Sequence, residues 1–541
     1  MNSQVSPIPG PARLREARVP AVLSRPRASR RVATATGYLC GLLLFGVASC
    51  TVGPDFQHPA APAVSGYTSP PLPPTTAAAP TAAGTAQRLV EGRDIPGEWW
   101  TLFHSPALTA LVERSLRNNP SLKAAQAALE VARETTLAQR GAYYPSVGAG
   151  LSATRQKTSS ELSPTPNSGA LYFSLYTPQV SVSYMPDIFG LNRRSVEALE
   201  AQADQARFAL AATHITLSAN VVAAAIQEAA LRGQLAATRQ LLGLGTNVLA
   251  VLRLQLAKGY VSGLEVAAQE AQLAQVRATL PPLLKQLAQQ RDLLAALSGG
   301  FPGQGLPERF DLADLRLPPE LPLSLPGQLI EQRPDVRLAE ANLHSACAQV
   351  GIAAANRLPN LTLTADAGTM ALAAGQMFSG GPGFWTLAGS LTQPVFAGGM
   401  LRHRERAARA AYSQAVAQYR GVVLTAFQNV ADSLHAIHQD ADGLQAAVAA
   451  QQAAQTSLDL TRRQFQAGYT TSLAVLSAEQ ADQQAVLNLV QAQANRYADT
   501  AALFQALGGG WWHRPELTPT DAPSAPSAAP ASPSLHATAH P

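Results

Sequence analysis

The 541-residue sequence predicts a mainly α-helical chain that also contributes β-strands to a membrane. Three observations predict this fold class: an internal duplication, very long helical heptad patterns, and strand patterns that come in two pairs. Charged residues make up only 14% of the chain, against roughly 25% in an average soluble domain. Together with many Ala, Gln, Leu and Val residues, this composition favours helices that pack closely through small side chains.

The duplication organises the chain into two copies of about 200 residues. Four landmarks of the first copy recur in the second, the prolines at an offset of 214 and the glycines at an offset of 209: Pro120 and Pro334, Pro145 and Pro359, Gly259 and Gly468, Gly299 and Gly508. Each copy reads as a helix, two strands, a very long helix and a shorter helix. The predicted segments are a first repeat at 96–310, with a β-hairpin near 143–186, and a second repeat at 311–512, with a β-hairpin near 358–395.

The helices of the second copy carry a heptad seam, which predicts packing along their whole length as in a coiled coil. Its apolar positions in the long helix are Val423, Phe427, Val430, Leu434, Ile437, Ala441, Leu444 and Val448. In the next helix they are Leu476, Leu487, Val490, Ala494, Tyr497, Ala501 and Phe504, with Gln480 and Gln483 in the two intervening positions. The first copy has a weaker seam of smaller residues at Ile215, Ala219, Val222, Ile226 and Ala229.

Length excludes a membrane-spanning role for the long helix. From Gly399 to Ala467 it would measure about 100 Å, whereas the apolar core of a bilayer is only ~30 Å thick. Arg, Gln and Asp occur throughout it. The helix must therefore project through water.

The strands alternate apolar and small or polar residues, as Val147, Ala149 and Leu151 do, or Val180, Val182 and Tyr184. This pattern fits a half-buried soluble sheet or an outer-membrane barrel. The lipid anchor predicted at Cys50 favours the barrel. A sheet in lipid must close on itself, yet four strands cannot enclose a passage. Copies of the chain must therefore assemble. Two copies would give eight strands with a filled interior, and three would give twelve strands with room for a channel.

The positive charge of the chain is confined to its beginning. The formal charge is +5, but residues 1–49 hold seven arginines and one acidic residue, and the rest of the chain holds 33 basic and 34 acidic residues. The body therefore lacks the basic stripe of a nucleic-acid binder, and we expect no nucleic-acid partner.

Basic residues, then an apolar run, then Val47-Ala48-Ser49 before Cys50, follow the order of a secretory signal. We predict a signal peptide at 1–49 and a bacterial lipobox, in which Cys50 is acylated and begins the mature protein. The alternative is a permanent membrane anchor, since about 18 uncharged residues can just span a bilayer. A lipidated linker at 50–95 would follow, and the Pro-, Ala- and Ser-rich stretches Pro59–Ala86 and Pro515–Pro541 predict an unstructured tether and a disordered tail at 513–541.

The chain resembles the outer-membrane factor (TolC-like) family, specifically its lipoprotein branch (NodT/OprM-like efflux outer-membrane lipoproteins). The motifs that carry the resemblance, in order, are Val47–Cys50 followed by Val52–Phe56, Pro186–Gly190, Gln393–Gly399, Gly468-Tyr469 before Leu473–Ala478, and Ala506–Trp511. The resemblance implies a homotrimer in the outer membrane of a Gram-negative bacterium, with a twelve-stranded β-barrel continued by a twelve-helix tunnel through the periplasm.

The resemblance also implies a function. Such proteins are passive exit ducts for drugs or other small solutes in tripartite efflux systems, together with a periplasmic adaptor (membrane fusion) protein and an inner-membrane pump, often of the resistance-nodulation-division class. The duct is not an enzyme and needs no cofactor beyond the covalent lipid on Cys50. The alternatives are the outer-membrane component of a protein secretion system, or a lipoprotein coiled-coil scaffold without a channel.

In this family the Gly-Tyr segments lie at the periplasmic tips of the helical hairpins, where the adaptor docks and the tunnel narrows. The resemblance assigns this role to the following residues: Gly259, Tyr260, Glu265, Gly468, Tyr469, Ala474 and Ser477. Family members often carry aspartates at the positions of Ala474 and Ser477, so the usual acidic ring is missing. Glu265, the first-copy counterpart of Ala474, either supplies the constricting charge or is a solvated surface residue.

An enzyme is the rival from another functional class. His435 and His438 lie three residues apart on one helix, but no third ligand stands near them, and a seam runs between them. Cys347 falls in an apolar helical pattern and is interpreted as a core residue. Nucleophile elbows, phosphate-binding glycine loops and paired-cysteine motifs are absent from the sequence.

Overall fold

The computed structural model describes residues 51–157, 172–379, 381 and 383–517. In chain order, the helices and strands within these ranges are β1 (Arg88–Glu91), α2 (Pro106–Asn118), α3 (Pro120–Arg140), β2 (Ser146–Lys157), β3 (Tyr172–Tyr184), α4 (Leu191–Ala257), α5 (Gly263–Leu297), β4 (Glu320–Leu323), α6 (Pro326–Gln332), α7 (Pro334–Ala355), β5 (Asn360–Thr369), β6 (Gly383–Thr392), α8 (Met400–Gln466) and α9 (Ser472–Ala506). The predicted signal peptide, Cys50 and most of the predicted tail lie outside the described residues.

The predicted duplication is confirmed residue by residue. The long helices α4 and α8 each have 67 residues, and the shorter helices α5 and α9 each have 35. The second-copy helices α8 and α9 begin and end 209 residues after their first-copy counterparts α4 and α5. The helices before the hairpins, α3 and α7, begin at the larger offset of 214, as do β2 and β5. The difference of five residues between the two offsets arises within the hairpins.

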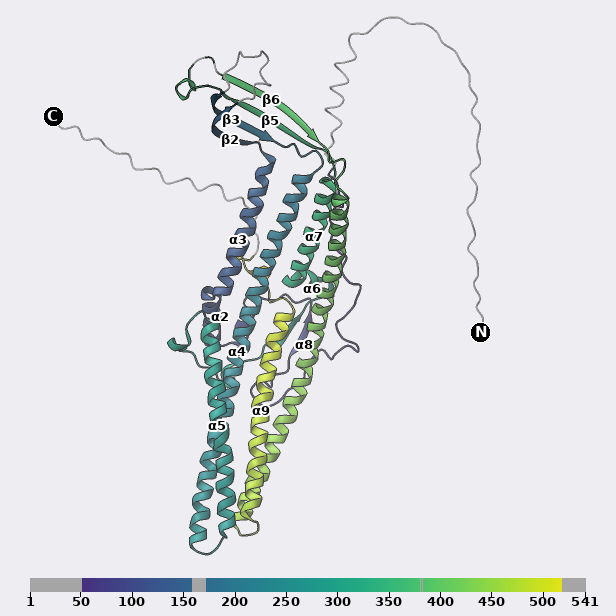
Figure 1. Ribbon diagram of the computed structural model, residues 1–541. Coiled ribbons are helices and arrows are strands. Elements are labelled where there is room, and N and C mark those ends of the chain that lie inside the picture. Colours follow the sequence, from purple (N-terminus) through teal and green to yellow (C-terminus); the bar gives the residue numbers. More distant parts are fainter. Residues whose placement is uncertain (1–50, 158–171, 380, 382, 518–541) are drawn as a thin grey trace, which may run out of the picture. The chain divides into compact units, whose positions relative to one another are not determined.

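The long helices α4 and α8 run from the four-stranded sheet to the opposite end of the described chain (Figure 1). Next to the sheet, the helices follow one another in the order α3, α4, α7, α8. Farther from the sheet, α5 and α9 take the places of α3 and α7, and the order becomes α5, α4, α9, α8. Each level therefore contains four neighbouring helices.

Most of the predicted heptad seam lies in the core. The seam residues of α8 are buried, apart from the partly buried Phe427, and the first-copy seam in α4 is buried throughout. The tip end of α9 differs, because Val475 and Glu479 are buried there in place of Leu476 and Gln480. An ion pair occupies this part of the contact, since Arg462 of α8 reaches Glu479 at 3.0 Å. A charged residue in the seam cannot be found by counting apolar positions.

The prediction that Pro59–Ala86 is unstructured is wrong. This segment runs along the helices, and the backbone carbonyl of Pro73 accepts a hydrogen bond from His438 Nε2 at 2.8 Å. Tyr67 donates to the carbonyl of Ser324 at 2.8 Å, and β1 then pairs in parallel with β4. The segment offers little apolar surface to bury, but polar side chains of the helices bind its backbone directly.

The predicted C-terminal tail also begins later than expected. Trp511 is buried, Trp511 Nε1 donates to the carbonyl of Gln332 at 2.7 Å, and Leu517 is buried in the same hydrophobic core. The chain is therefore packed as far as Leu517, and the remainder of the predicted tail lies outside the described residues.

Cys347 lies in α7 with 1% of its surface exposed, which confirms its interpretation as a core residue. Burial raises the pKa of its thiol. Of the two histidines considered as metal ligands, His438 is engaged by Pro73 and by the carbonyl of Leu434. Within the described ranges, groups of three or more His, Cys, Asp or Glu side chains arranged to hold a metal ion do not occur.

One of the described helices, α4, contains a stretch long and apolar enough to cross a membrane by length and composition. Residues of this stretch are 67% buried within the protein. They form part of the main hydrophobic core together with α2, α7 and α9.

Candidate functional site

The four-stranded sheet has the antiparallel order β2-β3-β5-β6, and its register aligns residues of one kind across all four strands. One such row, in register from strand to strand, is Val147, Val182, Ala365 and Leu387. The adjacent row on the opposite face is Gly148, Ser181, Asp366 and Thr386. Because facing residues of an antiparallel pair point to the same side, one face of the sheet is apolar and the other is small and polar.

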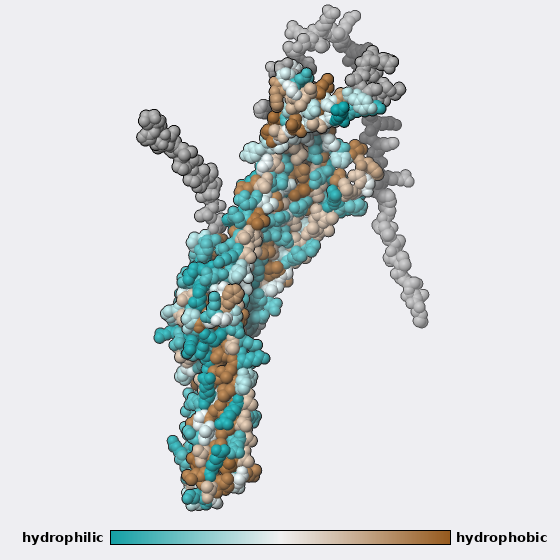
Figure 2. All heavy atoms as spheres, turned by 60° about the vertical axis from the view of Figure 1, so that its left-hand side comes forward, coloured by the Kyte–Doolittle hydropathy of each residue, from teal (hydrophilic) through white to brown (hydrophobic). Residues whose placement is uncertain are grey.

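The apolar face is open to the surroundings of the chain. Leu151, Trp385 and Leu387 expose 66%, 78% and 74% of their surface. Hydrophobic side chains lie on the surface at the sheet end of the molecule, among polar ones (Figure 2). Both outer strands, β2 and β6, have one edge that pairs with no other described strand. The predicted alternation is confirmed, and the sheet is left with an apolar face and two free edges.

The opposite end carries two hairpin tips built in the same way. Gly259 and Gly468 both have φ of +79°, a left-handed conformation that glycine adopts readily. In each tip the following tyrosine donates its N–H back to the helix, from Tyr260 to Gln255 O and from Tyr469 to Gln464 O, both at 2.9 Å. This arrangement satisfies carbonyls at the end of a helix. The tyrosine side chains are left 80% and 85% exposed.

Glu265 connects the two tips. Its Oε2 accepts the backbone N–H of Ser262 at 2.8 Å, which caps α5. Its Oε1 accepts the hydroxyl of Ser472, the first residue of α9, at 3.0 Å. The side chain is therefore partly buried and engaged on both oxygens, and not a freely solvated surface charge. Of the other predicted tip residues, Ala474 lies in the first turn of α9 and Ser477 is exposed on the same helix.

In each hairpin, one ion pair joins the two helices a few turns away from the tip. Neither pair was predicted from the sequence. Arg253 binds Glu270 at 2.6 Å between α4 and α5, and Arg462 binds Glu479 at 3.0 Å between α8 and α9. The pairs are related by the offset of 209. A search for charges that recur at this offset would have found them.

We expect Glu265→Ala to loosen the tips, because it frees the N–H of Ser262 and the hydroxyl of Ser472 together. Loss of a capping interaction costs about 0.5–2 kcal/mol. Amide hydrogen exchange of the segments around Tyr260 and Tyr469 should become several-fold faster. Glu265→Gln is the matched control, since glutamine also serves in a capping box, and it should restore much of the protection. Unchanged exchange in Glu265→Ala would contradict the link.

The N-terminal motif Val52–Phe56 contacts the sheet-proximal ends of the helices. Gly53 lies so close to α7 that an added Cβ would approach Gly351 Cα to 2.5 Å. Asp55 pairs with the buried guanidinium of Arg194 on α4 at 2.6 Å, and the ring of Phe56 stacks on His344 at 4.3 Å between centroids. The motif therefore attaches the residues after Cys50 to the end of the protein that bears the sheet.

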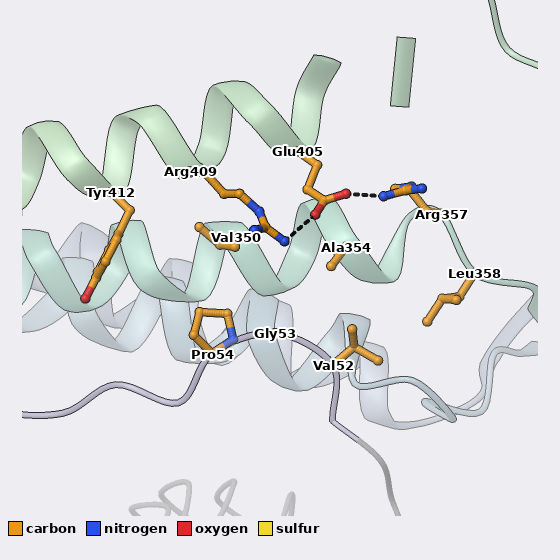
Figure 3. A pocket seen from close by; sticks show the side chains of 10 residues that line it. All are labelled: Val52, Gly53, Pro54, Val350, Ala354, Arg357, Leu358, Glu405, Arg409 and Tyr412. Atoms are coloured by element: carbon orange, nitrogen blue, oxygen red, sulfur yellow. Dashed lines mark hydrogen bonds and ion pairs between the residues drawn. The ribbon is translucent and has the colours of Figure 1, made fainter. Parts of the chain in front are cut away.

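A cavity of about 710 Å³ lies beside this motif, between α7 and the first turns of α8 (Figure 3). Its wall is mostly apolar, from Val52, Val350 and Leu358 among others. Glu405 lies at one side between the guanidinium groups of Arg357 and Arg409 (Figure 3), and the hydrogen bond from Arg357 lowers the pKa of this carboxyl group.

The motifs Pro186–Gly190 and Gln393–Gly399 directly precede the long helices α4 and α8. Asp187 caps α4, because its two carboxylate oxygens accept the N–H groups of Asn192 and Arg193 at 3.0 and 2.9 Å. Gly190 and Gly399, which precede α4 and α8, have φ of +81° and +85°. These positions explain why both motifs end in glycine.

The outer membrane efflux protein family matches residues 111–300 and 325–509, which correspond to the two copies. The toluene efflux pump outer membrane protein TtgF of Pseudomonas putida is 32% identical over 484 residues, covering 88% of this chain and 97% of that protein. The pyoverdine export outer membrane protein OpmQ of Pseudomonas putida is 32% identical over 470 residues, covering 82% and 94%. The solved structure of the outer-membrane channel OprN is 26% identical, covers 85% of this chain and all of that one, and has a TM-score of 0.76.

These similarities extend over the sheet, the long helices and both tips. The chain therefore belongs to the outer membrane efflux protein family and is an outer-membrane component of an efflux pump of a Gram-negative bacterium.

Proposed function

We propose that three copies of the chain close into a hollow cylinder and form the passive exit duct of a tripartite efflux pump. The sheet carries the argument, since it has one apolar face and two unpaired edges. Unpaired backbone groups are not tolerated in lipid. Joining β2 of one copy to β6 of the next removes every edge, and three copies supply twelve strands. The apolar rows then face lipid, and the polar rows face the passage.

The helices support the same arrangement. The outermost of the four neighbouring helices are α3 and α8 next to the sheet, and α5 and α8 near the tips. Exposed apolar side chains occur on these outer helices: Val131 and Leu137 on α3, Leu284 and Leu293 on α5, Leu424 and Leu460 on α8. Closing a ring would cover both edges with the complementary edges of neighbouring copies, as in a head-to-tail interface. Four helices at each level of three copies make a twelve-helix tunnel.

The tips are proposed to dock the periplasmic adaptor and to narrow the tunnel. Tyr260 and Tyr469 are mostly exposed there, and aromatic side chains are enriched at protein interfaces. The acidic ring expected at Ala474 and Ser477 is missing, and Glu265 is the charged group at the corresponding first-copy position. Its hydrogen bond to Ser472 holds the two tips of one copy together and would favour the narrow state.

Membership of the outer membrane efflux protein family supports the remaining parts of the proposal. An inner-membrane pump, of the resistance-nodulation-division class, supplies the energy, and the duct itself carries out no chemistry and needs no cofactor. Cys50 carries a lipid that anchors the chain in the outer membrane, at the end to which Val52–Phe56 is attached. Because TtgF and OpmQ are named for toluene and pyoverdine, the proposed cargo is small organic solutes.

Native mass spectrometry and planar-bilayer recording test the duct together. Protein purified in detergent should have the mass of three chains, and ions should pass when it is inserted into a bilayer. A matched variant that places prolines at alternate positions of β6 should prevent both, because proline cannot donate to a strand partner. A wild-type monomer, or a trimer without conductance under any opening treatment, would overturn the proposal.

A further inference from the structure

The apolar face of the sheet ends in positive charge. On this face β2 presents Val147, Ala149, Leu151 and Ala153, and then Arg155 and Lys157, all of them exposed. The register places Arg155 opposite Ser174 and Lys157 opposite Tyr172 on β3. Among the described residues of the four strands, these two are the charged side chains on the apolar face. Both lie at the strand end far from the helices.

The distance of Arg155 and Lys157 from the start of β2 matches the thickness of the apolar layer of a membrane. The ten residue-to-residue steps from Val147 to Lys157 span about 33 Å along the strand. With the usual strand tilt of about 40°, this corresponds to about 25 Å across the bilayer, which is the height of the apolar band of outer-membrane barrels. If Val147 lies at one border of the hydrocarbon layer, Lys157 reaches the other. The long side chain of Arg155 can extend to the same level.

The surroundings of the two cations are those of a membrane interface. The ammonium group of Lys157 lies over the ring of Tyr172, 5.4 Å from its centroid. Tyr172, directly opposite Lys157 on β3, exposes 60% of its surface. Exposed aromatic side chains mark the borders of the apolar band in outer-membrane barrels. Aspartate and glutamate do not occur on this face within the described residues, so the positive charge is not neutralised by the sheet itself.

We propose that Arg155 and Lys157 bind the phosphate groups of the lipid in the outer leaflet of the outer membrane. The inference rests on the proposed function, because it needs the sheet to span the membrane with its helices in the periplasm. A guanidinium and an ammonium two residues apart on one face can engage one phosphorylated headgroup from its membrane side. Arg pairs with phosphate through two parallel hydrogen bonds, and Lys binds it as a point charge. Three copies would provide three such sites around the barrel.

Lipid retention measured by native mass spectrometry tests this inference. Detergent-purified protein is incubated with diphosphorylated lipid A, monophosphorylated lipid A or phosphatidylglycerol, and the bound lipid is counted per assembly. Wild-type protein should retain diphosphorylated lipid A best. Arg155→Gln with Lys157→Gln should retain about tenfold less, since each basic residue near an anionic lipid surface contributes severalfold. The matched control is Arg277→Gln with Lys285→Gln, two exposed basic residues of α5, which should retain as much as wild type.

Equal retention by the strand variant and the wild type would overturn the inference, as would equal retention of the diphosphorylated and monophosphorylated lipids. Trimer mass and bilayer conductance are recorded on the same samples. A conducting trimer whose lipid A retention is unaffected by the double substitution rejects only the lipid site. A wild-type chain that neither assembles nor conducts rejects the duct itself.

Discussion

Replacing Arg496 by methionine should lower the free energy of unfolding by about 3 kcal/mol or more and release the N-terminal segment from the helices. The Arg496 side chain on α9 is 1% exposed. It donates to the carbonyl of Ile437 on α8 at 2.8 Å and, in the N-terminal segment, to Thr76 Oγ1 at 3.4 Å and to the carbonyl of Thr85 at 3.2 Å. One guanidinium thus joins α8, α9 and the segment, and methionine would remove all three of these hydrogen bonds.

The loss should grow with pH because of two neighbouring carboxyl groups. Burial, followed by a hydrogen bond with Asp440, raises the pKa of Asp499 to about 7, while Arg496 opposes this rise. The pKa of Asp499 in the folded protein lies above the ordinary aspartate value of 3.8, so the folded state binds more protons than the unfolded state. Stability is therefore lost as pH rises toward and through 7. Without Arg496, the pKa of Asp499 should rise further, which makes the variant weaker at pH 8 than at pH 6.

Urea denaturation followed by circular dichroism, at both pH values, measures the change. Limited proteolysis should cleave the variant within residues 59–86, which the folded wild type protects. Arg404→Met is the matched control, an exposed arginine on α8 whose replacement should change stability by less than about 0.5 kcal/mol. If Arg496→Met is as stable and as protected as that control, the N-terminal segment is not held by this side chain.

Gly508→Ala should destabilise the chain by about 3 kcal/mol or more, through strain at one backbone position. Gly508 has φ of +96°, and a Cβ there would lie 2.6 Å from the carbonyl oxygen of Gln332. That oxygen also accepts the indole N–H of Trp511, so it cannot withdraw without breaking this bond. The same construction occurs in the first copy, where a Cβ on Gly299 would lie 2.7 Å from the carbonyl oxygen of Asn118. We expect Gly299→Ala to be damaging for the same reason.

Thermal unfolding of the purified variants provides the measurement. Gly443→Ala is the matched control, since Gly443 lies within α8 with open space around it. Alanine should stabilise that helix by about 0.5–1 kcal/mol. A Gly508→Ala protein that melts together with Gly443→Ala would show that the close approach to Gln332 is relaxed at little cost.

The features found from the sequence are those encoded in local periodicity and in repetition. The helix predicted from Gly399 to Ala467 is observed as Met400–Gln466, because a proline-free heptad pattern and a glycine at each end define a helix without tertiary information. The strand alternation likewise predicted which residues share a face, since the period of two is a property of the strand alone.

The tip residues were located correctly but interpreted incompletely. Gly259 and Gly468 could be predicted as turn positions, because a positive φ is a local requirement that glycine meets. The hydrogen bond between Glu265 and Ser472 joins residues 207 positions apart in the chain. The sequence alone left two interpretations of Glu265 open, a constricting charge or a solvated surface residue. Neither interpretation included a hydrogen bond between the hairpins.

Sequence alone thus determined the repeated plan, the bounds of α8 and the two faces of the sheet, because repetition and local periodicity can both be read from the order of the residues. Only the tertiary structure decided that the proline-rich segment is ordered, that Arg496 and His438 bind it, and that the hairpin tips are joined. These contacts pair backbone carbonyls and isolated polar groups across hundreds of residues. Such pairs leave no period in the sequence, and their stabilisation exists only once the helices have brought donor and acceptor together.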